Sequence, residues 1–120
     1  MNKRPSPEHD RLVALIAGTL LQRGERNVRA DQSGYARPEA IRWRGERTGY
    51  VPDVTADALV VEVETAASLD EQATAEIWQL CAGYADRTDA AFIVVVPRGA
   101  EAKAQARLDA LGLEAQVIGA

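Results

Sequence analysis

The chain has 120 residues and a mass of 13.0 kDa, which allows one domain with one hydrophobic core. Its 47% apolar and 27% charged residues exclude a disordered tail or a fibrous protein, and the net charge of −4 argues against a broad basic surface that coats nucleic acid. The single cysteine, Cys81, cannot form an intramolecular disulfide, and no segment has the roughly 18 apolar residues of a transmembrane helix. We therefore expect a soluble, cytoplasmic protein without a membrane association.

The first part of the chain predicts one helix followed by weakly patterned structure. Ser6 is a favourable cap for a helix over residues 7–23, and Gly24 offers its C-terminal stop. Residues 27–55 hold few apolar side chains and several turn-forming residues. The short candidate strands in this stretch lie near 27–32 and 40–44.

The second part predicts a regular alternation of strands and helices. Two β-rich runs, 50–56 and 59–65, flank a polar turn and read as an antiparallel hairpin. Ser68 and Glu71 have capping-box spacing at the start of a helix over residues 69–86. The remaining predicted elements are a buried strand at 91–96, a helix at 100–111 and a strand at 114–118.

This order, αβββαβαβ, predicts an α/β fold in one domain spanning residues 1–120. A hairpin followed by crossover units implies a mixed β-sheet with helices on both faces. In a mixed α/β sheet the crevice opens at the carboxyl ends of the parallel strands, so we expect any functional site there.

Three acidic residues mark that end of the predicted sheet. Glu62 and Glu64 alternate along one strand and share a face about 7 Å apart. Asp53 follows Pro52 in the preceding strand, where a four-residue hairpin loop places it opposite Glu62 and a two-residue loop places it opposite Val60. Three carboxylates on one face repel, so they are solvated, partly protonated or neutralised by a cation.

A structural explanation and a functional one both fit these acids. Alternating glutamates on a strand often mark a solvated face, and Pro-Asp often opens a turn. Carboxylates beyond a strand that is apolar on both faces instead favour a binding site. An all-oxygen ligand set favours Mg²⁺ or Mn²⁺ over Zn²⁺.

The Pro-Asp, the Glu-x-Glu and the element order together resemble the PD-(D/E)xK, or restriction-endonuclease-like, nuclease superfamily. The resemblance implies that Asp53 and Glu62 bind Mg²⁺ or Mn²⁺ with the main-chain carbonyl of Val63. The family usually has lysine where this chain has Glu64, and the only lysines here are Lys3 and Lys103. Glutamate at that place implies a general base or a further metal ligand. Gln79 is similar to a glutamine that some branches carry in the next helix, where it contacts nucleic acid.

The sequence therefore predicts metal-dependent hydrolysis of phosphodiester bonds in nucleic acid, with DNA as the expected partner, by Asp53, Glu62 and Glu64. A homodimer is expected because two strands require two sites. A basic cluster is the predicted phosphate-binding surface: Arg42, Arg44 and Arg47. Trp43, within this cluster, either stacks on a base or packs in the core. His9 is expected to be exposed without a catalytic partner.

Two other classes of function stay open. One is a catalytically degenerate nuclease fold that acts as a nucleic-acid-binding or protein-assembly module, which the missing lysine and the acidic net charge favour. The other is an unrelated small α/β domain with a solvated acidic strand. The first class would bind nucleic acid or a partner without cleaving it, and the second would bind no divalent ion.

Overall fold

A computed structural model describes residues 6–47 and 49–120 and contains one mixed sheet of five strands in the order β1-β2-β3-β4-β5. Strands β1, β2 and β3 pair antiparallel, whereas β3, β4 and β5 run parallel. The predicted α/β fold and element order are confirmed. The elements are α1 (Pro7–Gln22), β1 (Arg29–Ala30), β2 (Val54–Ala56), β3 (Leu59–Val63), the 3₁₀ turn η1 (Ser68–Asp70), α2 (Gln72–Arg87), β4 (Ala91–Val96), α3 (Glu101–Leu111) and β5 (Gln116–Gly119).

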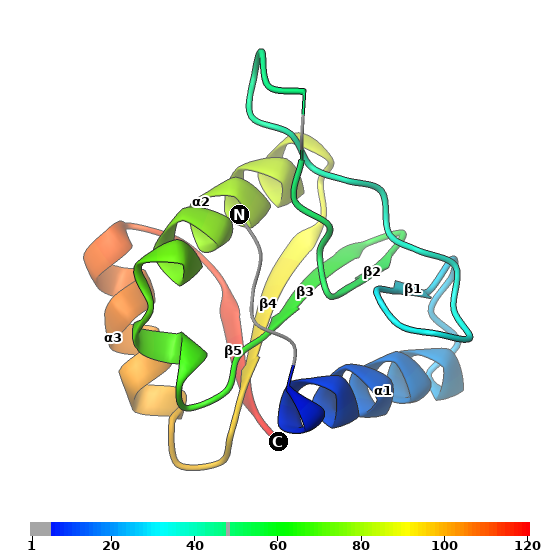
Figure 1. Cartoon of the computed structure of the whole chain (residues 1–120), viewed down its shortest axis with the longest axis horizontal. Helices are drawn as coiled ribbons and strands as arrows, with labels where there is room; N and C mark the ends of the chain where they lie inside the picture. Colours follow the sequence, from blue (N-terminus) through cyan, green and yellow to red (C-terminus); the bar gives the residue numbers. More distant parts are fainter. Residues whose placement is uncertain (1–5, 48) are drawn as a thin grey trace.

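Helices cover both faces of the sheet, as the sequence predicts. Helix α1 lies against one face, and α2 and α3 lie against the other (Figure 1). Alternate residues of β3 and β4 therefore enter two separate hydrophobic clusters, which explains their nearly continuous apolar sequences. No helix in the described ranges is long and apolar enough to cross a membrane.

The region before the hairpin is less regular than expected. The candidate strand at 40–44 is reduced to a single bridge between Ile41 and Tyr50. The run that begins at Tyr50 becomes a strand only at Val54. Proline has no N–H to donate to a sheet ladder, so Pro52 delays the start of this strand. Asp53 is consequently left in a bend just before β2.

The start of α2 also differs from the prediction. The expected capping box is wrong: α2 begins at Gln72, its N-cap is Glu71, and no side chain caps it. Ser68 lies in η1, where its hydroxyl accepts a hydrogen bond from Thr65 N–H and donates one to the Glu64 carboxylate. A hydroxyl committed to a buried carboxylate cannot also serve the helix N-terminus, so the local tertiary contact overrides the capping pattern.

Candidate functional site

The hairpin register brings Asp53 and Glu62 opposite each other. Val54 pairs with Val61, and one step further along both strands places Asp53 across from Glu62. The turn between the strands is formed by only two residues, Asp57 and Ala58. The expectation that a two-residue loop would place Asp53 opposite Val60 is therefore wrong.

Glu62 is fully buried and is held by two donors. Its Oε1 accepts a hydrogen bond from the Tyr50 hydroxyl at 2.5 Å, and its Oε2 accepts one from Asp53 N–H at 2.9 Å. Burial, followed by the charges of Glu62 and Asp53, raises the pKa of Tyr50 far above its usual value. The hydroxyl therefore stays protonated and remains a donor. Glu62 thus links β3 to Tyr50 and Asp53, which precede β2 in the chain.

Asp53 is held between the sheet and α1. Its Oδ2 accepts a hydrogen bond from Val63 N–H at 2.8 Å, and its Oδ1 lies 3.1 Å from Nε2 of His9 in the first turn of α1. The residue is only 5% exposed. The expectation that His9 is exposed without a partner is wrong, because its side chain is 14% exposed and contacts this carboxylate.

Glu64 belongs to a different network on the α2 face of the sheet. Its Oε1 accepts from the Ser68 hydroxyl at 2.8 Å, and its Oε2 accepts from Trp78 Nε1 at 3.0 Å. Both Glu64 and Trp78 are fully buried. Arg107 of α3 lies over the Trp78 ring, 5.8 Å from its centroid. Glu64 therefore ties the end of β3 to η1 and α2.

The three predicted acids are thus buried at one end of the hairpin and have different hydrogen-bond partners. Asp53 and Glu62 are linked directly, whereas Glu64 faces Trp78 and Ser68. Among residues 6–47 and 49–120, no three His, Cys, Asp or Glu side chains form a group that holds a metal ion between them.

The residues predicted to contact nucleic acid lie away from these acids. Arg42, Arg44 and Arg47 are exposed in a loop that projects beyond α2, distant from the carboxyl ends of β3 and β4 (Figure 1). Trp43, in the same loop, is 37% exposed and is not part of the core. Gln79 is exposed on α2 and lines a groove that also contains Phe92 and Leu113.

Of the two lysines in the chain, Lys103 lies in the part that the structure describes. Lys103 forms an ion pair with Asp70 at 2.6 Å on the surface, where both side chains are exposed. Lys3 lies outside the described residues.

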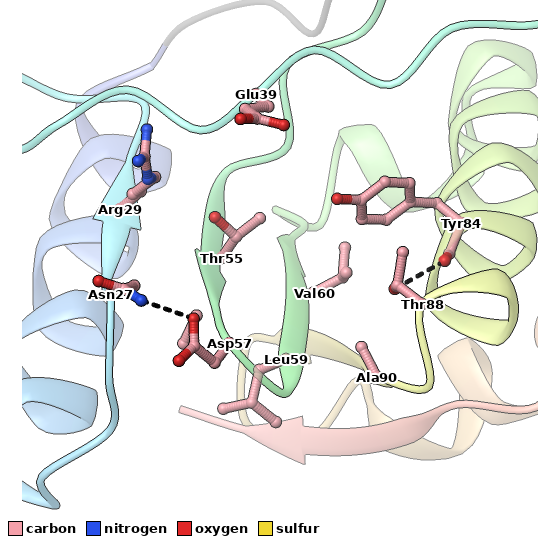
Figure 2. Close-up of a pocket in the computed structure, with 11 residues that line it drawn as sticks. Asn27, Arg29, Glu39, Thr55, Asp57, Leu59, Val60, Tyr84, Thr88 and Ala90 are labelled. Carbon is pink, nitrogen blue, oxygen red and sulfur yellow. Dashed lines mark hydrogen bonds between the residues drawn. The ribbon is translucent and has the colours of Figure 1, made fainter.

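A pocket of about 300 Å³ lies at the opposite end of the hairpin, around its turn (Figure 2). Figure 2 shows Asn27, Thr55 and Asp57 on one side of it and Tyr84 and Thr88 on the other. Val60 and Leu59 come from the strand between them. None of the predicted acidic residues lines this pocket, so it is separate from the acidic site.

Sequence reasoning missed two residues of the site, His9 and Tyr50. Tyr50 looked like a strand residue, and His9 looked like an exposed residue of a helix start. The spacing of Ser6 and Pro7 fixed where α1 begins, but only the packing of α1 on the sheet brings His9 to Asp53. No signal local to His9 in the sequence reports this contact.

Comparisons with protein-family models, with curated proteins and with solved structures find no match to this chain. The site is therefore interpreted from its own residues and their contacts.

Proposed function

We propose that this protein is a divalent-metal-dependent phosphodiester hydrolase that acts on nucleic acid, with DNA as the substrate to test first. The observation that carries the proposal is the buried pair of Asp53, just before β2, and Glu62 of β3, linked by the hydrogen bond from Asp53 N–H to Glu62 Oε2. Buried carboxylates are costly for a small domain, and such costs are typical of functional sites.

The chemistry of the donor set fits Mg²⁺ or Mn²⁺. The ligands in this proposal are the carboxylates of Asp53 and Glu62 and the main-chain carbonyl of Val63, all of them hard oxygen donors. Val63 N–H donates to Asp53 Oδ2. In an extended strand the N–H and C=O of one residue point to the same edge, so the Val63 carbonyl also points towards the end of β2. When bound, the ion would polarise the phosphate and lower the pKa of a water molecule.

The remaining residues have supporting roles in this proposal. Tyr50 holds the Glu62 carboxylate in place, and Glu64 takes the proton of the attacking water. The basic loop binds phosphates at a distance from the acids, and its exposed Trp43 stacks on a base. This loop comprises Arg42, Trp43, Arg44, Gly45, Glu46 and Arg47. A homodimer would provide two such sites for the two strands of a duplex, and cytoplasmic localisation is a further part of the proposal.

A second candidate is a catalytically degenerate fold that binds nucleic acid or assembles with a protein. The contacts of Glu64 favour it, because this fully buried carboxylate accepts hydrogen bonds from the half-buried Ser68 hydroxyl and from Trp78 Nε1–H. A base that must receive a proton from water needs access to that water. In this alternative Glu64 is a structural residue and the domain binds without cleaving.

The first prediction separates these two candidates. Wild type should bind Mn²⁺ in calorimetric titrations and nick supercoiled plasmid or branched DNA. Asp53→Asn and Glu62→Gln should each weaken Mn²⁺ binding at least about tenfold and slow cleavage about 100-fold, because each removes one charged ligand of the ion. Glu76→Gln, which neutralises an exposed acid of α2, is the matched control and should change neither quantity.

Each possible outcome favours or excludes one of the two candidate functions. DNA binding without Mn²⁺ binding or cleavage would support the degenerate module. Cleavage that survives Asp53→Asn would show that the hydrolytic activity does not use this pair. Circular dichroism of each variant verifies that the compared proteins are folded.

A further inference from the structure

We propose that His9 is a positioning residue for Asp53: its imidazole holds the Asp53 carboxylate in the orientation in which that carboxylate binds the divalent ion. This inference rests on the proposed function and adds to it a residue from outside the acidic motif. The first turn of α1 thereby becomes part of the site, although the sequence predicts only an exposed histidine there.

Two hydrogen bonds from different elements determine how the Asp53 carboxylate lies. Val63 N–H of β3 holds Oδ2 at 2.8 Å, and Nε2 of His9 in α1 holds Oδ1 at 3.1 Å. A carboxylate oxygen only accepts, so Nε2 carries the proton of this hydrogen bond. Because these two donors contact different oxygens, together they constrain both the position and the plane of the carboxylate.

His9 is itself held in place by the start of α1. Its backbone N–H donates to the Ser6 hydroxyl at 3.1 Å, which caps the helix. Gln32 Nε2 donates to the carbonyl of Asp10 at 2.8 Å, which docks the first helical turn on the loop that follows β1. The second ring nitrogen, Nδ1, lies 3.5 Å from Asp10 Oδ1. The imidazole therefore approaches Asp53 from a supported position in the first turn of α1.

Asp53 needs this support because of where it lies. It occupies a bend before β2, where the ladder that orients Val54 and later residues has not yet begun. The torsion that rotates an aspartate carboxylate is broad, so donors on both oxygens define the plane of the carboxylate better than a donor on one oxygen does. Among divalent ions, Mg²⁺ demands near-ideal octahedral ligand geometry. Outer residues that orient metal ligands typically change metal affinity 10–100-fold when they are removed.

The test compares His9→Phe with His9→Gln and uses Mn²⁺ as the probe. Phenylalanine keeps a ring but has no donor, whereas the glutamine amide places a donor near the position of Nε2. His9→Phe should weaken Mn²⁺ binding about tenfold or more, and His9→Gln should stay within about threefold of wild type. Calorimetric titration measures binding without reference to catalysis. Cleavage assays on the same samples should show the loss in His9→Phe partly recovered at high Mn²⁺ concentration.

Each result decides the inference. Unchanged Mn²⁺ affinity in His9→Phe overturns the positioning role while leaving the metal site intact. Equal losses in His9→Phe and His9→Gln also overturn it, because they would assign the effect to the ring and not to its donor. Absence of Mn²⁺ binding by wild type overturns both this inference and the proposed function. If His9→Phe does not fold, His9→Ala gives the same comparison without added bulk.

Discussion

Glu64→Lys restores the residue that the nuclease resemblance implies, and the structure predicts that it destabilises the fold. The substitution removes the acceptor of the buried Trp78 Nε1–H and of the half-buried Ser68 hydroxyl, and it places an ammonium group beside them. An unsatisfied buried donor costs about 1–3 kcal/mol, and a buried charge without its counter-group costs several kcal/mol more. We expect a loss of at least about 4 kcal/mol from the free energy of unfolding, a large part of the roughly 5–15 kcal/mol of a typical domain.

Glu64→Gln is the matched variant because its amide oxygen still accepts from Trp78 Nε1. We expect it to cost about 1–2 kcal/mol. Glu76→Lys, an exposed acid on α2, controls for the change of charge and should stay within about 0.5 kcal/mol of wild type. Urea unfolding followed by circular dichroism measures all three free energies. A Glu64→Lys protein within about 1 kcal/mol of wild type would refute the reasoning that Glu64 is a buried structural acceptor.

Two further predictions concern Tyr50 and the basic loop. Burial, followed by the charges of Glu62 and Asp53, raises the pKa of Tyr50 in the folded protein. As the pH rises, the unfolded chain therefore loses the Tyr50 proton before the folded protein does. The contribution of Tyr50 to the free energy of unfolding is complete below pH about 10 and falls above it. Spectrophotometric titration of native wild type and Tyr50→Phe should therefore give the same tyrosinate signal, and a smaller signal in the variant would contradict the assignment. Replacing the three loop arginines (Arg42, Arg44 and Arg47) by alanine should lower the salt dependence of DNA binding by up to about 3 in log–log slope and change stability by less than about 0.5 kcal/mol. Fluorescence anisotropy measures the binding, and an unchanged slope would exclude the loop as the phosphate-binding surface.

The sequence alone predicts the elements whose signals are local in the chain. Strand β4 lies at Ala91–Val96, as the apolar run ended by Pro97 predicts, and α3 ends before Gly112, which adopts a left-handed conformation. The alternation of Val and Glu in β3 also predicted which of its residues share a face. These features depend on propensity and periodicity, which a single sequence carries.

The hydrogen-bond partners of the acidic residues depend on the tertiary structure and could not be predicted from the sequence. Ser68 has the spacing of a helix cap, yet it serves the Glu64 carboxylate, because a buried charged acceptor competes successfully for its hydroxyl. Glu62 and Glu64 share a face in the sequence pattern, but they have different partners. Glu64 accepts a hydrogen bond from Trp78 of α2, whereas Glu62 accepts hydrogen bonds from Tyr50 and Asp53. His9 meets Asp53 across 44 positions of the chain. Such contacts depend on how helices dock on the sheet, and no short sequence interval records that arrangement.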